Sequence, residues 1–327
     1  MKELFGLMKF GTQSALWAAV INTVVAIIKT AAYLITGNVA MFAEMMHSFG
    51  DAANQFFVFI GSALSKKEPT ERFPGGFGRL VNLVLLGAVL IVGVLAYETI
   101  VEGVHHITNA TQSEDWFWLN ISVLGASALL EAGVLYKAMK EITEHLPKEQ
   151  TKGLKLLPLS YKHVKEAKPA TKLVFLEDNV AVGGALLAML AIIIATYTPF
   201  HSATGYASII IGVALIFVVG RIFLDNAAGA LGVADVKMQA RMGARILQHE
   251  HITDIQDLDV IKEGDSLHVE LRVEVDPNMT IKQADEIRNY IEEKITESVD
   301  NVTDIIIEFD DDDGIDTWRN ISSEDKK

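Results

Sequence analysis

Six apolar segments, each long enough to cross a bilayer as a helix, constrain this chain more than any other feature. A hydrocarbon core of roughly 30 Å requires about 20 helical residues. Half of the 327 residues are hydrophobic and the mean hydropathy is +0.28, which is unusual for a protein with a water-exposed surface. The sequence therefore predicts an all-α six-helix transmembrane bundle within residues 1–232, with spans at about 12–35, 39–64, 77–102, 116–137, 171–197 and 203–224.

Lysine and arginine are unevenly distributed among the segments that connect these spans. They occur before the first span, between spans two and three, and between spans four and five, where lysine alone occurs nine times. The other three connections contain neither residue. Because positively charged loops stay in the cytoplasm, the pattern predicts a multi-pass protein of the cell inner (cytoplasmic) membrane with both termini cytoplasmic.

From about Val233 onward the sequence becomes charged and alternating, as in a soluble domain. A helix over 235–250 is followed by two strands around a turn at Lys262–Ser266, a helix over Thr280–Ser298 and a strand over Val302–Phe309. This αββαβ order predicts a cytoplasmic α+β domain at 233–313, ferredoxin-like or metallochaperone-like, and then a polar tail at 314–327. Such a small domain has a modest core, so we expect it to pair in a homodimer.

Several function classes are disfavoured. The net charge of −14 and the acidic run Asp310–Asp313 argue against a nucleic-acid partner. The absence of cysteine excludes disulfides and thiolate metal ligands. Since the sequence contains neither a GxxxxGK[ST] phosphate loop nor an HExxH motif, it favours a secondary transporter over an ATP-driven pump or an enzyme. A membrane metal-dependent enzyme and a membrane-anchored metal sensor are the alternatives.

The second span carries polar residues that are costly at membrane depth and usually mark a pathway or binding site. His47 and Asp51 are four residues apart, so they lie one turn apart on one helix face. Measured from an outer end near Val39, they lie about 12 and 18 Å into the membrane. Glu44 and Gln55 extend the same stripe in the two directions.

The fifth span carries three consecutive polar residues, Glu177, Asp178 and Asn179. Neighbours on a helix point about 100° apart, so at most two of the three can face one site. The Gly183-Gly184 pair that follows predicts a close approach of another helix. Elsewhere in the membrane, Lys29 can extend toward the interface or pair with a carboxylate, and Glu131 has no predicted partner.

An imidazole and two or three carboxylates that converge in a dry bundle would make a site for a divalent ion, which would neutralise their charge. The alternative is a buried His–Asp contact that only joins two helices. A donor set of one histidine with carboxylates is harder than a set with two imidazoles. We expect Zn2+ as cargo and no prosthetic group; because the donor set is harder, Fe2+ and Mn2+ stay open as alternatives, together with Co2+ and Cd2+.

The His-x-x-x-Asp pattern of span two, the acids of span five, the six spans and the αββαβ tail together resemble the cation diffusion facilitator family over nearly the whole chain. Phe73-Pro-Gly-Gly-Phe-Gly-Arg79 is similar to the glycine-rich segment that leads into the family's third span. The resemblance implies a homodimer that exchanges a divalent metal for protons by alternating access. It also implies two metal ligands from span two and two from span five.

Carried onto this sequence, the resemblance makes His47 and Asp51 the ligands of span two and Asp178 one ligand of span five. One turn before Asp178 stands Val174, which cannot ligate, so Glu177 is the expected substitute. The Leu-Glu-Asp sequence there is similar to a variant in the family branch that includes a mitochondrial-type zinc transporter.

Four further residues are weaker candidates for metal binding. In the membrane, Glu44, Asn179 or a water molecule can complete the coordination shell. In the C-terminal domain, where family members often bind metal, the histidines do not fall at the usual positions and only Glu308 and Asp310 remain as candidates.

Overall fold

The computed structural model describes residues 9, 11–109, 116–144, 146–147, 153–164, 169–263, 266–299 and 302–318. The chain forms two compact units. One consists of residues 11–60 and 84–224, and the other includes residues 61–83 and the chain from 225 onward.

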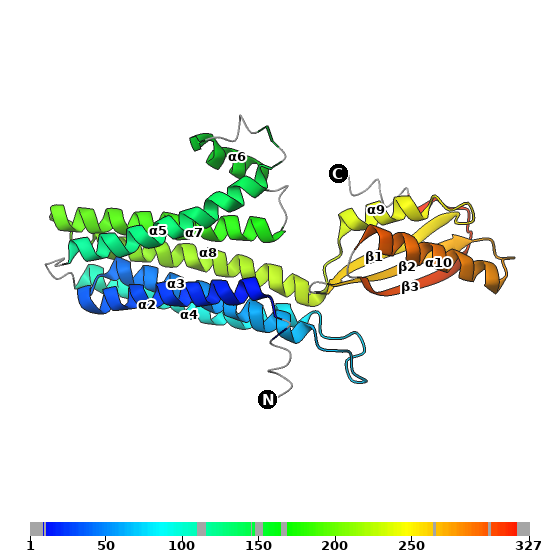
Figure 1. The fold of residues 1–327 in the computed structure, drawn as a ribbon, viewed down its shortest axis with the longest axis horizontal. Helices are drawn as coiled ribbons and strands as arrows, with labels where there is room; N and C mark the ends of the chain where they lie inside the picture. The colour runs from blue at the N-terminus through cyan, green and yellow to red at the C-terminus, as the bar shows by residue number, and fades with distance from the viewer. Residues whose placement is uncertain are drawn as a thin grey trace. The chain divides into compact units, whose positions relative to one another are not determined.

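Long helices that run side by side build the first unit (Figure 1). They coincide with the six predicted segments, although several continue further than the apolarity alone indicates. A 3-10 turn at Gly153–Lys155 and a short helix, α6 (Leu156–His163), lie between the fourth and fifth of them. The long helices are α2 (Gln13–Thr36), α3 (Val39–Ser65), α4 (Leu80–Thr108), α5 (Phe117–Ile142), α7 (Pro169–Tyr197) and α8 (Ala203–Leu231).

Five of these helices, α2, α4, α5, α7 and α8, are long and apolar enough to cross a membrane, judged over the described residues. The 27-residue α3 is long enough, yet it falls outside this set. Its sequence explains the difference, because Glu44, His47 and Asp51 lower its apolarity while the helix keeps a predominantly apolar composition elsewhere. That α3, the second predicted span, crosses the membrane therefore stays a prediction, and so does the total of six spans.

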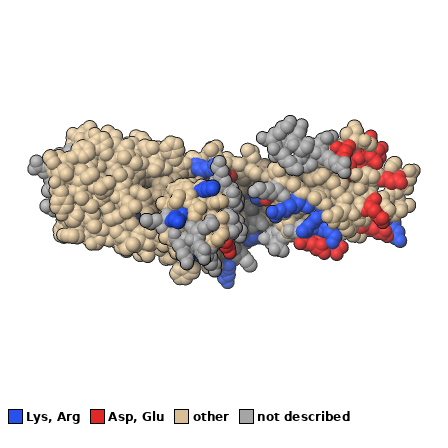
Figure 2. Space-filling model, turned by 90° about the horizontal axis from the view of Figure 1, so that it is seen from above, with Lys and Arg blue, Asp and Glu red and all other residues tan. Residues whose placement is uncertain are grey.

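The outer surface of the bundle is apolar. Leu34, Leu90, Leu129 and Phe217, on four different helices, each expose between 73 and 77% of their surface. On the face shown in Figure 2, the bundle is free of charged side chains over most of its length, whereas acidic side chains gather on the C-terminal domain. Exposed apolar surface on this scale is typical of contact with lipid.

Small residues bring the helices of the bundle together. Gly103 of α4 and Gly205 of α8 are so close that a Cβ atom on either would lie 2.8 Å from the backbone oxygen of the other. Next to this crossing, the Ser208 hydroxyl donates a hydrogen bond of 2.8 Å to the carbonyl oxygen of Thr99. Close approach at small residues, reinforced by polar contacts, is the usual mode of helix association in membranes.

The C-terminal domain has the predicted αββαβ order. Its elements are α9 (Val236–Ile246), β1 (Asp254–Glu263), β2 (Ser266–Val275), α10 (Ile281–Ser298) and β3 (Val302–Asp311). The sheet has the order β1-β2-β3, with β1 antiparallel and β3 parallel to the central β2. A parallel neighbour requires a crossover, which α10 supplies.

Helix α10 begins and packs as its sequence predicts. The Thr280 hydroxyl and the Gln283 side chain form a reciprocal capping box at its first turn. Ile287, Ile291 and Ile295 are buried at helical spacing against the strands. The packed region reaches beyond Asp313, because Trp318 packs against the domain core and its backbone N–H lies 3.3 Å from the Asp254 carboxylate.

Candidate metal centre

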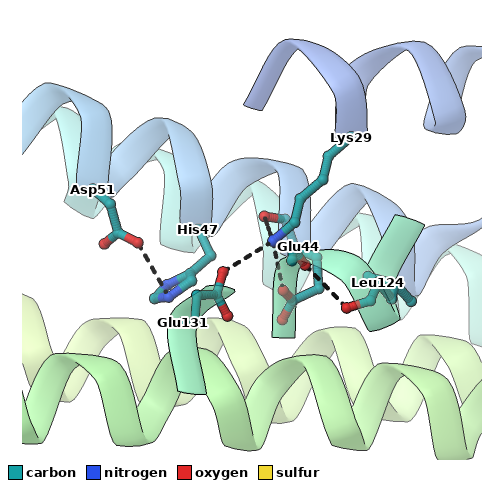
Figure 3. A network of polar contacts seen from close by, with 7 residues as sticks. Lys29, Glu44, His47, Asp51, Leu124 and Glu131 are labelled. Carbon is teal, nitrogen blue, oxygen red and sulfur yellow. Dashed lines mark hydrogen bonds and ion pairs between the residues drawn. The ribbon is translucent and has the colours of Figure 1, made fainter. Parts of the chain in front are cut away.

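His47 and Asp51 lie on one face of α3 at the predicted spacing. The Nε2 atom of His47 lies 3.4 Å from Oδ2 of Asp51 (Figure 3). The imidazole is only 3% exposed, and neither of its nitrogens has a hydrogen-bond partner among the described residues. A buried imidazole whose nitrogens make no hydrogen bond is unusual; Nδ1 is available to an added ligand, and Nε2 has only the ion-pair contact with Asp51.

On α7, Asp178 lies within electrostatic range of this pair. Its carboxylate interacts electrostatically with Asp51 and His47, and its buried Oδ2 atom has no hydrogen-bond partner within the described part of the chain. Glu177 also interacts electrostatically with Asp51. The two predicted acids of α7 therefore lie in the same polar region as the α3 pair.

Glu177 is also connected to α3 through Asn54, a residue outside the predicted ligand set. The amide of Asn54 donates to Oε1 of Glu177 at 3.5 Å. Asn54 follows Asp51 by three residues, so helical spacing placed it on the ligand face. The side chain of Val174, one turn before Asp178, lies outside the described residues.

A second residue outside the predicted ligand set is Glu131 of α5. Its carboxylate interacts electrostatically with His47 and Asp51 and acts in turn on Asp178. Its Oε2 atom is buried and has no hydrogen-bond partner in the described structure. A carboxylate in the middle of an apolar span was the available signal, but nothing in the sequence indicated which helices it would face.

Glu44, a further ligand candidate, lies one turn before His47 and is fully buried. Its Oε2 atom forms an ion pair of 3.0 Å with the ammonium of Lys29 on α2. Lys29 therefore pairs with a carboxylate rather than extending to the interface. A Cβ atom on Gly184 would lie 2.7 Å from Oε1 of Glu44, which confirms the predicted close approach at this glycine. Gly183 has no atom within 4 Å of such a Cβ in the described structure.

Asn179, the other candidate on α7, is engaged elsewhere. Its amide nitrogen donates to the carbonyl oxygen of Phe175 at 2.6 Å, and its Oδ1 atom accepts a hydrogen bond of 2.9 Å from Tyr161 of α6. The Tyr161 ring also contacts Phe175 edge-on. These contacts attach α6 to α7 next to Asp178, so Asn179 joins helices in this structure.

The two candidates in the C-terminal domain lie on its surface. Glu308 on β3 forms an ion pair of 3.0 Å with Arg272 on β2. Asp310 is exposed near the end of β3, where its Oδ1 atom accepts a hydrogen bond from the N–H of Asp311. Neither contact involves a histidine.

The candidate ligands in the bundle are not arranged around a common point. Within the described residues, no three histidine or acidic side chains come close enough to hold one metal ion. Nevertheless, His47, Asp178 and Glu131 contribute unpartnered, buried ligand atoms from three different helices. Imidazole and carboxylate groups of this kind are ones for which protons and divalent ions compete.

Comparison with known proteins agrees with this architecture. Residues 15–229 match the cation efflux transmembrane domain, and residues 235–312 match the cytoplasmic domain of cation efflux proteins. The second match begins one residue before α9.

Curated relatives include the human proton-coupled zinc antiporter SLC30A9, mitochondrial, which is 26% identical over 71% of this chain. The mouse protein of the same name is 27% identical over 66% of the chain. This chain covers only 40% and 37% of the lengths of these two relatives. The magnetosome protein MamB of Magnetospira sp. (strain QH-2) is 23% identical over 88% of this chain and 91% of its own length. From the matched domains, the chain belongs to the cation diffusion facilitator family of metal transporters.

Proposed function

We propose that this protein exports a divalent metal ion, Zn2+ first among the candidates, in exchange for protons by alternating access. His47, Asp51, Asp178 and Glu177 would bind the ion within the membrane. Six spans, with α3 among them, would place both termini in the cytoplasm and the protein in the cell inner membrane. The proposal assigns transport and no enzymatic reaction.

One observation carries the proposal: His47 on α3 and Asp178 on α7 contribute buried ligand atoms that lack a hydrogen-bond partner among the described residues, and the two side chains interact electrostatically within a bundle that has an apolar exterior. Isolated ionisable groups at this depth are costly. A divalent ion would compensate the carboxylates in one state, and protons would do so in the other. Because the same groups bind either the metal ion or protons, the two are exchanged across the membrane, and no nucleotide is required.

The relatives and the donor set support different aspects of the cargo assignment. The names of the human and mouse relatives, proton-coupled zinc antiporters, support zinc and proton coupling. The oxygen-rich donor set, with one imidazole and several carboxylates, keeps Fe2+ and Mn2+ as alternative cargo. In this proposal the Glu177-Asp178 pair takes the place of two ligands one turn apart on α7, as in the family branch whose Leu-Glu-Asp variant this segment resembles.

A homodimer is part of the proposal. The C-terminal domain matches the cytoplasmic domain of the family, and its three-stranded sheet has β1 and β3 as edges. A small sheet with two edges gains stability when a second copy covers part of it. Light scattering on the detergent-solubilised protein is expected to return twice the mass of one chain, and a single-chain mass across micromolar concentrations would contradict the homodimer.

Metal flux into proteoliposomes tests the function directly. With a pH gradient across the membrane, we expect saturable Zn2+ uptake that collapses when the gradient is dissipated. Adding Fe2+, Mn2+, Co2+ or Cd2+ as competitor ranks the cargo ions. Equal Zn2+ flux with and without the gradient would reject proton exchange, and an absence of flux for every ion would reject transport.

Cysteine labelling tests the proposed topology. A cysteine at Asn109 is expected to react with a membrane-impermeant reagent from outside right-side-out vesicles, whereas a cysteine at Lys155 is expected to be protected. Labelling of position 155 under these conditions would overturn the six-span arrangement.

A further inference from the structure

Lys29 and its partner Glu44 are both fully enclosed charged side chains of the bundle. The Lys29 side chain is 0% exposed, in the middle of the apolar helix α2. The ammonium nitrogen lies 3.0 Å from Oε2 of Glu44, 3.5 Å from the carbonyl oxygen of Glu44 and 3.5 Å from Oε1 of Glu131 (Figure 3). Three oxygen atoms from two helices thus surround one cation.

The oxygen atoms around Lys29 outnumber what one ammonium group requires. Oε1 of Glu44 and Oε2 of Glu131 are also buried and have no hydrogen-bond partner within the described residues. Two carboxylates and a backbone carbonyl provide the all-oxygen environment that hard cations prefer. The oxygen atoms around Lys29 therefore resemble the ligands of a cation site, and the cation that they surround is the ammonium group of Lys29.

This second group of carboxylates is continuous with the candidate metal centre. Glu44, His47 and Asp51 are spaced by three and four residues along one face of α3. Glu131 interacts electrostatically with both Lys29 and His47, and so it lies between the two groups. A divalent ion at His47 would consequently have a second carboxylate-lined position close beside it if that position were vacant.

We propose that Glu44 and Glu131 form a second cation site in the bundle, and that the ammonium of Lys29 permanently occupies it as a tethered cation. Lys29 thereby limits the bundle to one divalent ion and sets its cargo stoichiometry. The position of the first ion rests on the function proposed above, whereas the second site is defined by the contacts of Lys29 alone.

The substitution Lys29→Met tests the proposal because it removes the charge and keeps a side chain of similar length. Equilibrium binding of radioactive Zn2+ and of Mn2+ is measured on the full-length protein in detergent. We expect Lys29→Met to bind one more divalent ion per chain than the unmodified protein. Adding Glu44→Gln or Glu131→Gln to this variant is expected to remove the extra ion, and the exposed-lysine variant Lys140→Met serves as control.

The binding result distinguishes this proposal from the proposed function. The proposal is overturned if folded Lys29→Met binds no more metal than the unmodified protein, whatever the flux assay returns. Should Lys29→Met fold poorly, its thermal unfolding is measured with and without millimolar Mn2+, and rescue by the ion is the expected result. A variant that folds only after both carboxylates are neutralised, and that no divalent ion rescues, would show a structural ion pair alone.

Discussion

The imidazole of His47 and the carboxylate of Asp51 lie 3.4 Å apart on one face of α3, yet they are not equally enclosed. The His47 side chain is 3% exposed, whereas that of Asp51 is 36% exposed. His47 therefore lies in the buried region with Asp178 and Glu131, whereas Asp51 lies where the helix is more exposed.

His47→Ala is expected to reduce Zn2+ flux by about 10- to 100-fold or more, since the loss of a ligand costs no less than the loss of a group that orients one. His47→Asp is expected to keep transport and to shift preference from Zn2+ toward Mn2+, because an oxygen donor replaces a nitrogen donor. Competition between the two ions in proteoliposomes measures both effects. An unchanged ion preference in His47→Asp would exclude His47 from the coordination shell.

A matched pair of glycines tests the packing of α7 against α3. A Cβ atom on Gly184 would lie 2.7 Å from Oε1 of Glu44, which the ion pair with Lys29 restrains, whereas Gly183 has open space around it. We expect Gly184→Ala to destabilise the bundle by about 1–3 kcal/mol through overpacking. Gly183→Ala is expected to be neutral or stabilising by up to about 1 kcal/mol, because alanine is the better helix former.

Unfolding of the two glycine variants in detergent, followed by circular dichroism with increasing denaturant, compares their stabilities. Similar midpoints for Gly183→Ala and Gly184→Ala would show that α7 does not approach Glu44 as described.

In the C-terminal domain, burial raises the pKa of Glu274, and the nearby carboxylates Asp313, Asp254 and Asp312 add to the rise against an opposing hydrogen bond from Gln256. The folded state thus holds this proton more tightly than the unfolded chain does. Ionisation of Glu274 therefore costs stability. The free energy of unfolding of the domain falls as the pH rises from the ordinary carboxyl range through the raised pKa of Glu274.

Glu274→Gln is accordingly expected to raise the thermal unfolding midpoint of this domain in the full-length protein near pH 8, with the advantage narrowing as pH falls toward about 4. Glu293→Gln, at an exposed position of α10, is the control and should change little. Scanning calorimetry in detergent across this pH range gives both midpoints, and a lower midpoint for Glu274→Gln at alkaline pH would contradict the assigned cost.

Local sequence predicted much of the fold, because apolar length and periodicity decide where helices and strands form. The six long helices, the αββαβ order and the Thr280 cap of α10 follow from neighbours in the chain. The polar composition of residues 314–327 predicts a tail, yet Trp318 packs against the domain; this contact is not predictable from neighbouring residues because its partners, including Asp254, lie far away in sequence.

Contacts between helices were harder to predict. The i, i+4 spacing predicts that His47 lies beside Asp51 on α3. It does not predict which other helix packs against that face, because the face covers a wide arc. Whether Asn179 faces metal or Tyr161, and whether Glu131 faces lipid or Lys29, depends on the rotation of each helix in the bundle. Single-sequence patterns do not contain that rotation.

The central claim is that carboxylates on α3 and α7 together bind the transported ion. Zn2+ flux driven by a pH gradient, measured in proteoliposomes for Asp51→Ala, Asp178→Ala and the exposed-carboxylate control Glu98→Gln, tests it most directly. We predict that both alanine variants lose flux while Glu98→Gln keeps it. Flux equal to that of the unmodified protein in both alanine variants would contradict the claim and leave the intramembrane cluster with a structural role.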